Sequence, residues 1–182
     1  MTSALQQLLK QLVRKTSLSR LNALLNRSDI EIQDASENPD IATPWVGLIL
    51  VTSDSIQVDF KIQCDNESVK FFAEQLNHQN DATQNHAAND LLYEYCNLVG
   101  GYIKNTLDQQ QVAFKLSLPL ITHNADNLII NVSTDANIFY DYWKLVIGNR
   151  SLFCSVAFEV KDDIVLTGEI LEFADSGEIK FL

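Results

Sequence analysis

Apolar residues spaced three and four positions apart predict three helices. The first covers residues 3–25, with Thr16-Ser17 as the point where it could break. A shorter helix is expected to begin at a cap at residues 65–66, and a second long helix spans about residues 87–107. The apolar stripe of this last helix consists of Leu92, Cys96, Val99 and Ile103, widened by Leu91, Leu98 and Leu107.

Runs of β-branched and aromatic residues predict strands. Residues 45–51 and 56–62 flank a turn at Ser53-Asp54 and should form a hairpin, whereas the polar segment 34–44 should be a loop. Further strands are expected at residues 112–118, 128–132, 139–147, 152–160 and 164–173. Because strands joined by short turns pair antiparallel, we expect an α+β fold, an antiparallel sheet with two long helices packed on one face.

The size and composition are those of one globular domain. The chain is 46% hydrophobic and 20% charged, a composition typical of a globular protein with a substantial core. Its 182 residues are enough for one domain and too few for two domains of ordinary size. We therefore expect a single domain over residues 1–182, in which residues 162–182 form a C-terminal strand extension without an assigned role.

Charge and cysteine content argue against several classes of function. The formal net charge of −11 repels phosphate backbones and anionic membranes, so we expect no nucleic acid and no membrane as a partner. Three widely spaced cysteines without a C-x-x-C pair fit neither a disulfide framework nor a zinc site, and they indicate the cytoplasm. No stretch approaches about eighteen apolar residues, so a membrane-spanning helix is not expected.

One side of the second long helix carries a row of polar or small residues. These residues stand at i, i+4, i+7 and i+11 and are Asp90, Glu94, Asn97 and Gly101. Such spacing places them along one side of a helix, roughly opposite the apolar stripe. We therefore expect a solvent-facing row that is held from behind by the core.

A carboxamide and a carboxylate one turn apart suit a particular kind of chemistry. The amide of Asn97 can hold a water molecule and present its lone pair to an electrophile without taking the proton. The carboxylate of Glu94 can pair with a cation on an incoming partner and fix the register of docking. The pair favours positioning water against a phosphoryl group whose metal and basic residues come from elsewhere.

The spacing of these residues resembles the signature of the CheC/CheX/FliY phosphatase family. That signature has Asp or Ser, then Glu four residues later, Asn three residues after that, and a distant Pro. Asp90, Glu94, Asn97 and Pro119, the last after twenty-one intervening residues, match it. Only one complete motif is present, which resembles the single-site CheX arrangement, and the order of elements over residues 1–160 is similar to that of CheX-like proteins.

This resemblance implies a reaction and residue roles. By analogy with the family, Asn97 would orient the water that hydrolyses the aspartyl phosphate of a CheY-like receiver domain, and Glu94 would dock to a receiver lysine. Asp90, Gly101 and Pro119 would support the motif, Gly101 by letting a partner backbone approach closely. Magnesium would sit in the phosphorylated receiver, so this chain would need no metal and no cofactor. CheX-like proteins are often homodimers, which leaves a homodimer open.

Other features have simpler interpretations. Glu74 and Asn77 repeat the E-x-x-N spacing without a matching proline, and we interpret them as a solvated helix end. Tyr95 could crowd the docking surface or extend it, while Cys96 is expected to be a buried, inert thiol. The aromatic run 139–143 is interpreted as core and strand residues, or alternatively as an exposed dimer surface. Surface positions are expected for the histidines, which are His78, His86 and His123.

Three hypotheses about function stay open on these grounds. The first is a phosphatase that acts on a phosphorylated receiver domain. The second is a non-catalytic module that recognises a receiver or a flagellar switch component with the same helix face. The third is a structural dimer whose polar helix face is incidental, and burial of Asn97 or Glu94 against the chain's own residues would favour it.

Overall fold

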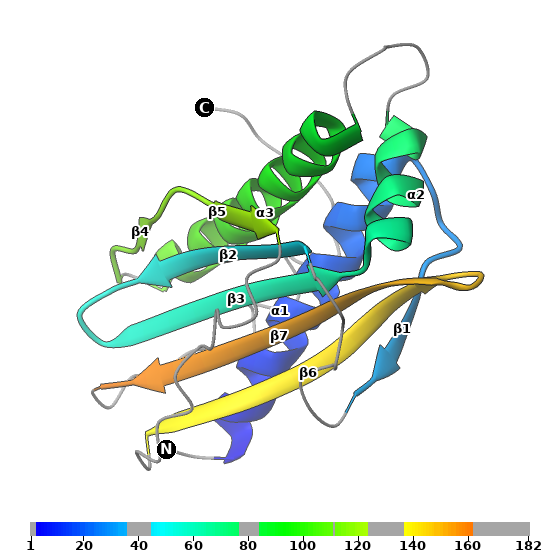
Figure 1. The fold of residues 1–182 in the computed structure, drawn as a ribbon. Helices are drawn as coiled ribbons and strands as arrows, with labels where there is room; N and C mark the ends of the chain where they lie inside the picture. Colours follow the sequence, from blue (N-terminus) through cyan, green and yellow to red (C-terminus); the bar gives the residue numbers. More distant parts are fainter. Residues whose placement is uncertain (1–2, 36–44, 77–83, 111, 124–136, 162–182) are drawn as a thin grey trace.

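The computed structural model describes residues 3–35, 45–76, 84–110, 112–123 and 137–161, which form a two-layer α+β structure (Figure 1). One layer is a seven-stranded sheet, and the other consists of helices packed on one of its faces. The helices are α1 (Ser3–Leu25), α2 (Asn66–Leu76) and α3 (Gln84–Asp108). The predicted fold class is therefore confirmed.

The sheet is antiparallel at every pairing of the described strands. The strands are β1 (Glu31–Asp34), β2 (Trp45–Thr52), β3 (Ile56–Cys64), β4 (Lys115–Leu116), β5 (Leu120–His123), β6 (Ile138–Ile147) and β7 (Arg150–Val160). Their order is β1-β6-β7-β3-β2-β4, with β5 also pairing with β2. As a result, β1 lies at one edge of the sheet, and β4 and β5 lie at the other.

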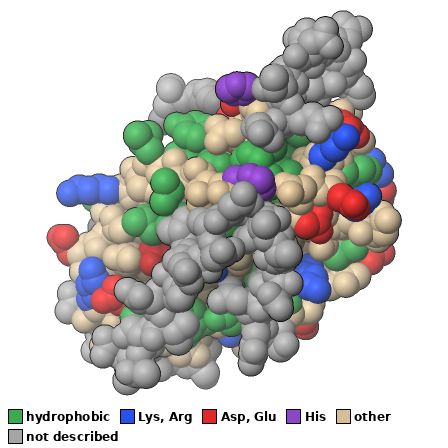
Figure 2. Space-filling view, in the orientation of Figure 1, with side chains coloured by type: hydrophobic (Ala, Val, Ile, Leu, Met, Phe, Trp, Pro, Cys, Tyr) green, Lys and Arg blue, Asp and Glu red, His purple; other side chains and the backbone are tan. Residues whose placement is uncertain are grey.

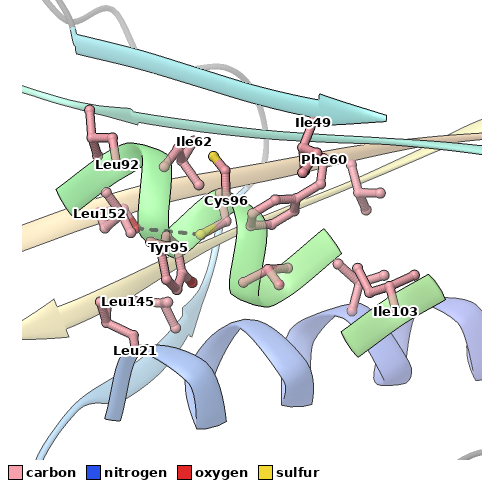
Figure 3. Close-up of a cluster of buried hydrophobic side chains, with 14 of the residues drawn as sticks. Leu21, Ile49, Phe60, Ile62, Leu92, Tyr95, Cys96, Ile103, Leu145 and Leu152 are labelled. Carbon is pink, nitrogen blue, oxygen red and sulfur yellow. Dashed lines mark hydrogen bonds between the residues drawn. The ribbon is translucent and has the colours of Figure 1, made fainter. Parts of the chain in front are cut away.

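The predicted hairpin is present as β2 and β3. Its turn is closed by Ser53, whose amide donates to the Ile56 carbonyl at 2.8 Å and whose hydroxyl accepts from the Ile56 amide at 3.0 Å. Side chains of these strands alternate between the two faces of the sheet. Figure 3 shows Ile49, Phe60 and Ile62 among the buried residues that pack against α3.

Helix α1 is continuous, so the break considered at Thr16-Ser17 is wrong. The hydroxyl of Ser17 donates to the carbonyl of Arg14 at 2.8 Å, and this bond lets a polar residue lie inside a buried helix. The helix ends at Leu25, and the next residue, Asn26, has a left-handed φ of 50°. The amide of Arg27 then donates to the carbonyl of Asn22 at 2.9 Å, a common way to close a helix.

The observed strands differ from the predicted ones in segments where apolar and polar residues do not clearly alternate. β6 and β7 match their predicted spans within two residues, whereas the strand expected at 112–118 is reduced to β4. β1 and β5 were not predicted, and all four residues of β1 are exposed, which leaves no alternation to detect. The strands expected at 128–132 and 164–173, most of the 34–44 loop and the 162–182 extension lie outside the described residues.

The aromatic run 139–143 divides between the two faces of the sheet. Trp143 is fully buried in the core, as the core interpretation requires. Tyr140 and Tyr142, at alternate positions of β6, are half-buried and stack with ring centroids 6.5 Å apart. The alternative of a dimer surface remains a prediction.

Candidate functional site

Helix α3 is seated firmly on the rest of the chain by its apolar stripe. It packs against α1, α2 and the β2–β5 end of the sheet. All four predicted stripe residues, Leu92, Cys96, Val99 and Ile103, are buried. Figure 3 shows Leu92, Cys96 and Ile103 within the hydrophobic cluster between the helices and the sheet. The helix therefore presents a fixed outer side to its surroundings.

The predicted polar row lies on that outer side. Asp90 and Glu94 are exposed, and Asn97 and Gly101 are half-buried. Within the part of the chain that the structure describes, the side chains of Glu94 and Asn97 form no hydrogen bond and no ion pair. Neither is buried against the chain's own residues, so the burial that would favour an incidental face is not observed. A carboxylate and an amide without an internal role are available to a partner.

Tyr95 neither crowds nor extends this surface, so both expectations for it are wrong. Its side chain is 1% exposed, and its hydroxyl donates to the backbone carbonyl of Ser17 at 2.9 Å. Its ring also meets the ring of Phe60 edge-on, with 6.3 Å between centroids. A rotation of about 100° per residue carries this position from the polar row into the core.

Cys96 is buried, as expected. Burial raises the pKa of its thiol to about 12, so the thiol stays protonated at neutral pH. A buried protonated thiol is not a nucleophile. The chemistry of this helix therefore rests on its outer side.

The two adjacent glycines of α3, Gly100 and Gly101, differ in how closely other residues pack against them. A side-chain carbon at Gly100 would lie 2.8 Å from Cδ1 of Ile49 and 2.9 Å from Cδ1 of Leu116, so the sheet packs directly on the helix backbone there. At Gly101, no neighbouring atom lies within 4 Å of that position. The chain's own packing requires the first glycine and not the second.

The family resemblance implies that Pro119 lies within the strand after the helix; it lies instead in the break between β4 and β5, so this expectation is wrong. Proline has no amide hydrogen for a strand ladder, which accounts for the break. Leu116 lies against Gly100, and both Ile121 and Cys96 lie beside Gly47. Leu116 and Ile121, on either side of Pro119, therefore both face the side of α3 that packs on the sheet.

A shallow cavity of about 320 Å³ opens near the N-terminal ends of α2 and α3. Trp45 stacks on His123 with 4.5 Å between ring centroids, and its indole nitrogen donates to the side-chain oxygen of Asn66 at 2.9 Å. Ala88, two residues before Asp90, also lines the cavity. None of the motif residues lines the cavity.

Two further properties concern metals and membranes. In the described ranges, no group of three or more His, Cys, Asp or Glu side chains is placed to hold a metal ion. None of the described helices combines the length and the apolar character needed to cross a membrane.

Comparison with models of known protein families identifies a match to this chain. The model of the family described as chemotaxis phosphatase CheX matches residues 46–142, more than half of the chain. This range holds β3, α2, α3 and the proposed motif, and all of β2 except Trp45. No curated protein sequence matches the chain.

Solved structures with a similar fold include three from bacteria. A CheC-like superfamily protein from Shewanella sp. PV-4 aligns with a TM-score of 0.66 at 15% identity, covering 87% of this chain and 99% of that one. CheX from Vibrio vulnificus aligns with a TM-score of 0.65 at 14% identity, covering 84% and 99%. CheX of the CheX-CheY-BeF3-Mg complex from Borrelia burgdorferi aligns with a TM-score of 0.62 at 15% identity, covering 85% and 97%. At these identities the likeness shows the fold.

Proposed function

Because the chain belongs to the CheX family of chemotaxis phosphatases, we propose that it hydrolyses the aspartyl phosphate of a CheY-like receiver domain, with Asn97 orienting the water and Glu94 docking to the receiver. The single observation that carries this proposal is the state of these two side chains. Both stand on the outer side of a helix whose rear is packed into the core, and neither has a partner among the described residues.

The proposed reaction requires this chain mainly to position a water molecule. Hydrolysis of an acyl phosphate needs a water molecule held in line with the bond that breaks, and an amide can both donate to and accept from that water. Holding the water on a rigid helix removes much of the entropic cost of its attack. Glu94 would pair with a cation of the receiver and fix the register of docking.

Magnesium would be held by the receiver and not by this chain. In the related Borrelia complex, CheX is bound to CheY with magnesium and beryllium trifluoride, which stands in for a phosphoryl group. This composition supports a receiver that brings the metal and the phosphoryl group together. The contribution of this chain is then the water-positioning amide and the docking surface.

The remaining motif residues would shape the docking face. Gly101 lies one turn beyond Asn97, where the absence of a side chain leaves room for a partner backbone. Asp90 adds a second exposed carboxylate one turn before Glu94. Pro119 would interrupt the edge of the sheet between β4 and β5.

Loss of phosphate from a labelled receiver tests the catalytic role. Wild-type protein should shorten the lifetime of the phosphorylated receiver, and Asn97→Ala should return it to the receiver's own rate. Asn105→Ala is the matched control, because Asn105 is an exposed asparagine on the same helix, about two turns further on. Unchanged phosphate lifetime with wild-type protein, against every receiver of the organism, would reject the proposal.

A second pair of variants tests docking. Glu94→Ala should raise KM more than it lowers kcat, whereas Glu74→Ala, an exposed glutamate on α2, should change neither. Loss of turnover with unaltered affinity would contradict the docking role. Tight binding of the phosphorylated receiver without phosphate loss would support a non-catalytic recognition module.

A further inference from the structure

An exposed aromatic side chain lies on α3 beside the polar row. Among the described residues of this helix, Tyr93 is the large hydrophobic residue that reaches the surface, where it is 38% exposed. Figure 2 shows hydrophobic side chains at the surface in the upper part of the molecule, where α3, β4 and β5 lie. Tyr93 stands one residue before Glu94 and four residues before Asn97. An exposed ring contributes little to the core, so packing of the core does not account for a tyrosine at this position.

The neighbours of Asn97 on the helix surface differ between its two sides. Residues three and four positions apart on a helix lie next to each other. Toward the N-terminus these neighbours are Glu94 and Tyr93. Toward the C-terminus they are Gly100 and Gly101, and no atom lies within 4 Å of where a side-chain carbon of Gly101 would be. Asn97 therefore has bulky side chains on one side and open space on the other.

The side chain of Asn97 leans toward the bulky side. In an α-helix the bond from Cα to Cβ tilts toward the N-terminus, so a side chain covers the turn that precedes it. For Asn97 that turn carries Tyr93 and Glu94. Asn97 is half-buried, whereas Asp90 and Glu94 in the same row are exposed. The ring of Tyr93 is the larger of the two groups that can shield the amide in this way.

We propose that Tyr93 is a positioning residue, whose ring holds the Asn97 amide in the orientation that aims the attacking water. This inference rests on the proposed function and adds a residue to it. An unrestrained amide samples several rotamers, and a water molecule held by it samples the same range of directions. The ring blocks the rotamers that turn the amide away from the open side next to Gly101. Restricting the amide before the receiver binds lowers the ordering cost of the reaction.

This role belongs to the ring of Tyr93 and not to its hydroxyl. Tyr93→Phe keeps the ring and should therefore behave as wild type, whereas Tyr93→Ala removes the ring and keeps a residue that favours the helix. The loss in Tyr93→Ala should appear in turnover and not in affinity, because a misdirected amide leaves the docking carboxylate of Glu94 in place. A residue with a purely structural role would change stability without this division between turnover and affinity.

Nuclear magnetic resonance of the full-length protein, without a receiver, tests the contact between the ring and the amide. The side-chain amide signals of Asn97, assigned by their absence in Asn97→Ala, should be displaced by the ring current of Tyr93. Tyr93→Phe should keep this displacement, and Tyr93→Ala should lose it. Ile32→Ala is the matched control, because Ile32 is 39% exposed on β1 at the edge of the sheet, and it should leave the signals unchanged. Identical Asn97 signals in wild type and Tyr93→Ala would overturn the proposal.

Loss of phosphate from a labelled receiver tests the consequence for turnover. At saturating protein, Tyr93→Ala should lower the rate about tenfold, because the amide no longer holds the water in line. Its Kd for the receiver with beryllium trifluoride and magnesium should equal that of wild type. Tyr93→Phe and Ile32→Ala should match wild type in both measurements. A raised Kd with an unchanged rate would overturn the proposal, since the ring would then contact the receiver. An equal loss of rate in Tyr93→Phe would also overturn it.

The outcomes separate this inference from the proposed function. If wild-type protein removes phosphate and Tyr93→Ala removes it at the same rate, the positioning role is overturned while the phosphatase stands. If wild-type protein removes phosphate from no receiver, both fail. A melting temperature of Tyr93→Ala equal to that of wild type shows that the change in rate does not come from unfolding. If that temperature is lowered, Tyr93→Gln provides a second variant without the ring.

Discussion

The hydroxyl of Tyr95 on α3 donates a hydrogen bond to the backbone carbonyl oxygen of Ser17 on α1, with 2.9 Å between the two oxygens. The side chain of the same serine accepts from the indole nitrogen of Trp143 on β6 at 3.0 Å. One serine therefore joins both long helices and the sheet through buried hydrogen bonds. The helix that carries the candidate site is fixed in the core by polar as well as apolar contacts.

Tyr95→Phe should lower the free energy of unfolding by about 1 kcal/mol, because it removes one buried hydrogen bond and keeps the ring. Urea denaturation followed by circular dichroism measures this change. Tyr93→Phe is the control, since the hydroxyl of an exposed tyrosine should contribute less than about 0.5 kcal/mol. Equal stability of Tyr95→Phe and wild type would show that the bond to Ser17 contributes nothing.

Alanine at the two adjacent glycines should have opposite effects on stability. Gly101→Ala should stabilise the protein by up to about 1 kcal/mol, because the position is open and alanine favours the helix. Gly100→Ala should destabilise it by about 1 kcal/mol, because crowding against Ile49 and Leu116 outweighs the same gain. Thermal melts of the two variants measure the difference.

The same pair separates stability from docking. If Gly101 makes room for a receiver backbone, Gly101→Ala should be the more stable protein and the weaker binder. Its Kd for the beryllium trifluoride form of the receiver should rise severalfold. A Gly101→Ala protein that binds as tightly as wild type would show that the open space above this glycine is not used.

The three cysteines should resist labelling in the folded protein. Cys64, Cys96 and Cys154 are buried and unpaired, and burial raises the pKa of each, that of Cys96 to about 12. At pH 8 a thiol reagent should react with them only at the rate of unfolding, whereas all three should react at once in denaturant. Rapid labelling of Cys96 in native protein would contradict the seating of α3 described above.

These thiols also predict how stability depends on pH. In the unfolded chain they ionise near a pKa of about 8.5, whereas the folded chain keeps them protonated. A group whose folded pKa is raised contributes stability below its unfolded pKa and loses it as pH rises. The free energy of unfolding should therefore fall above about pH 8.5, and Cys96→Ala should fall less steeply over that range.

Asp141→Ala should destabilise the protein by about 2 kcal/mol, because it removes a buried carboxylate that holds a charged partner. Nε of Arg14 donates to Oδ2 of Asp141 at 2.6 Å, and a second guanidinium nitrogen donates to Oδ1 at 2.9 Å. Arg14 also pairs with Asp34 of β1, whose side chain is largely exposed. Asp34→Ala should therefore cost less than Asp141→Ala in the same denaturation experiment, and the reverse order would contradict this ranking.

Much of the site could be predicted because it lies on one helix. The spacing of Glu94 and Asn97 opposite a stripe that includes Cys96 fixes which residues face solvent and which face the core. Periodicity also held the information needed for Tyr95, which stands four residues after Leu91 and four before Val99, both buried. The surface position expected for Tyr95 is therefore one that this spacing already contradicted.

The parts that could not be predicted depend on contacts far apart in sequence. β1 has a weak local pattern and is a strand because it pairs with β6, more than a hundred residues later. The position of Pro119 at the edge of the sheet depends on β4 and β5 both pairing with β2. Neither relationship leaves a trace in the spacing of neighbouring residues.

The close packing of α3 on the hydrophobic core has a consequence for how another protein binds to it. A helix that is already packed on α1, α2 and the sheet needs little further ordering when another molecule binds to it. Structural adjustment would then fall on the incoming protein. Differences in affinity among binding partners should therefore arise from how readily each partner adjusts its own structure to fit the surface of α3.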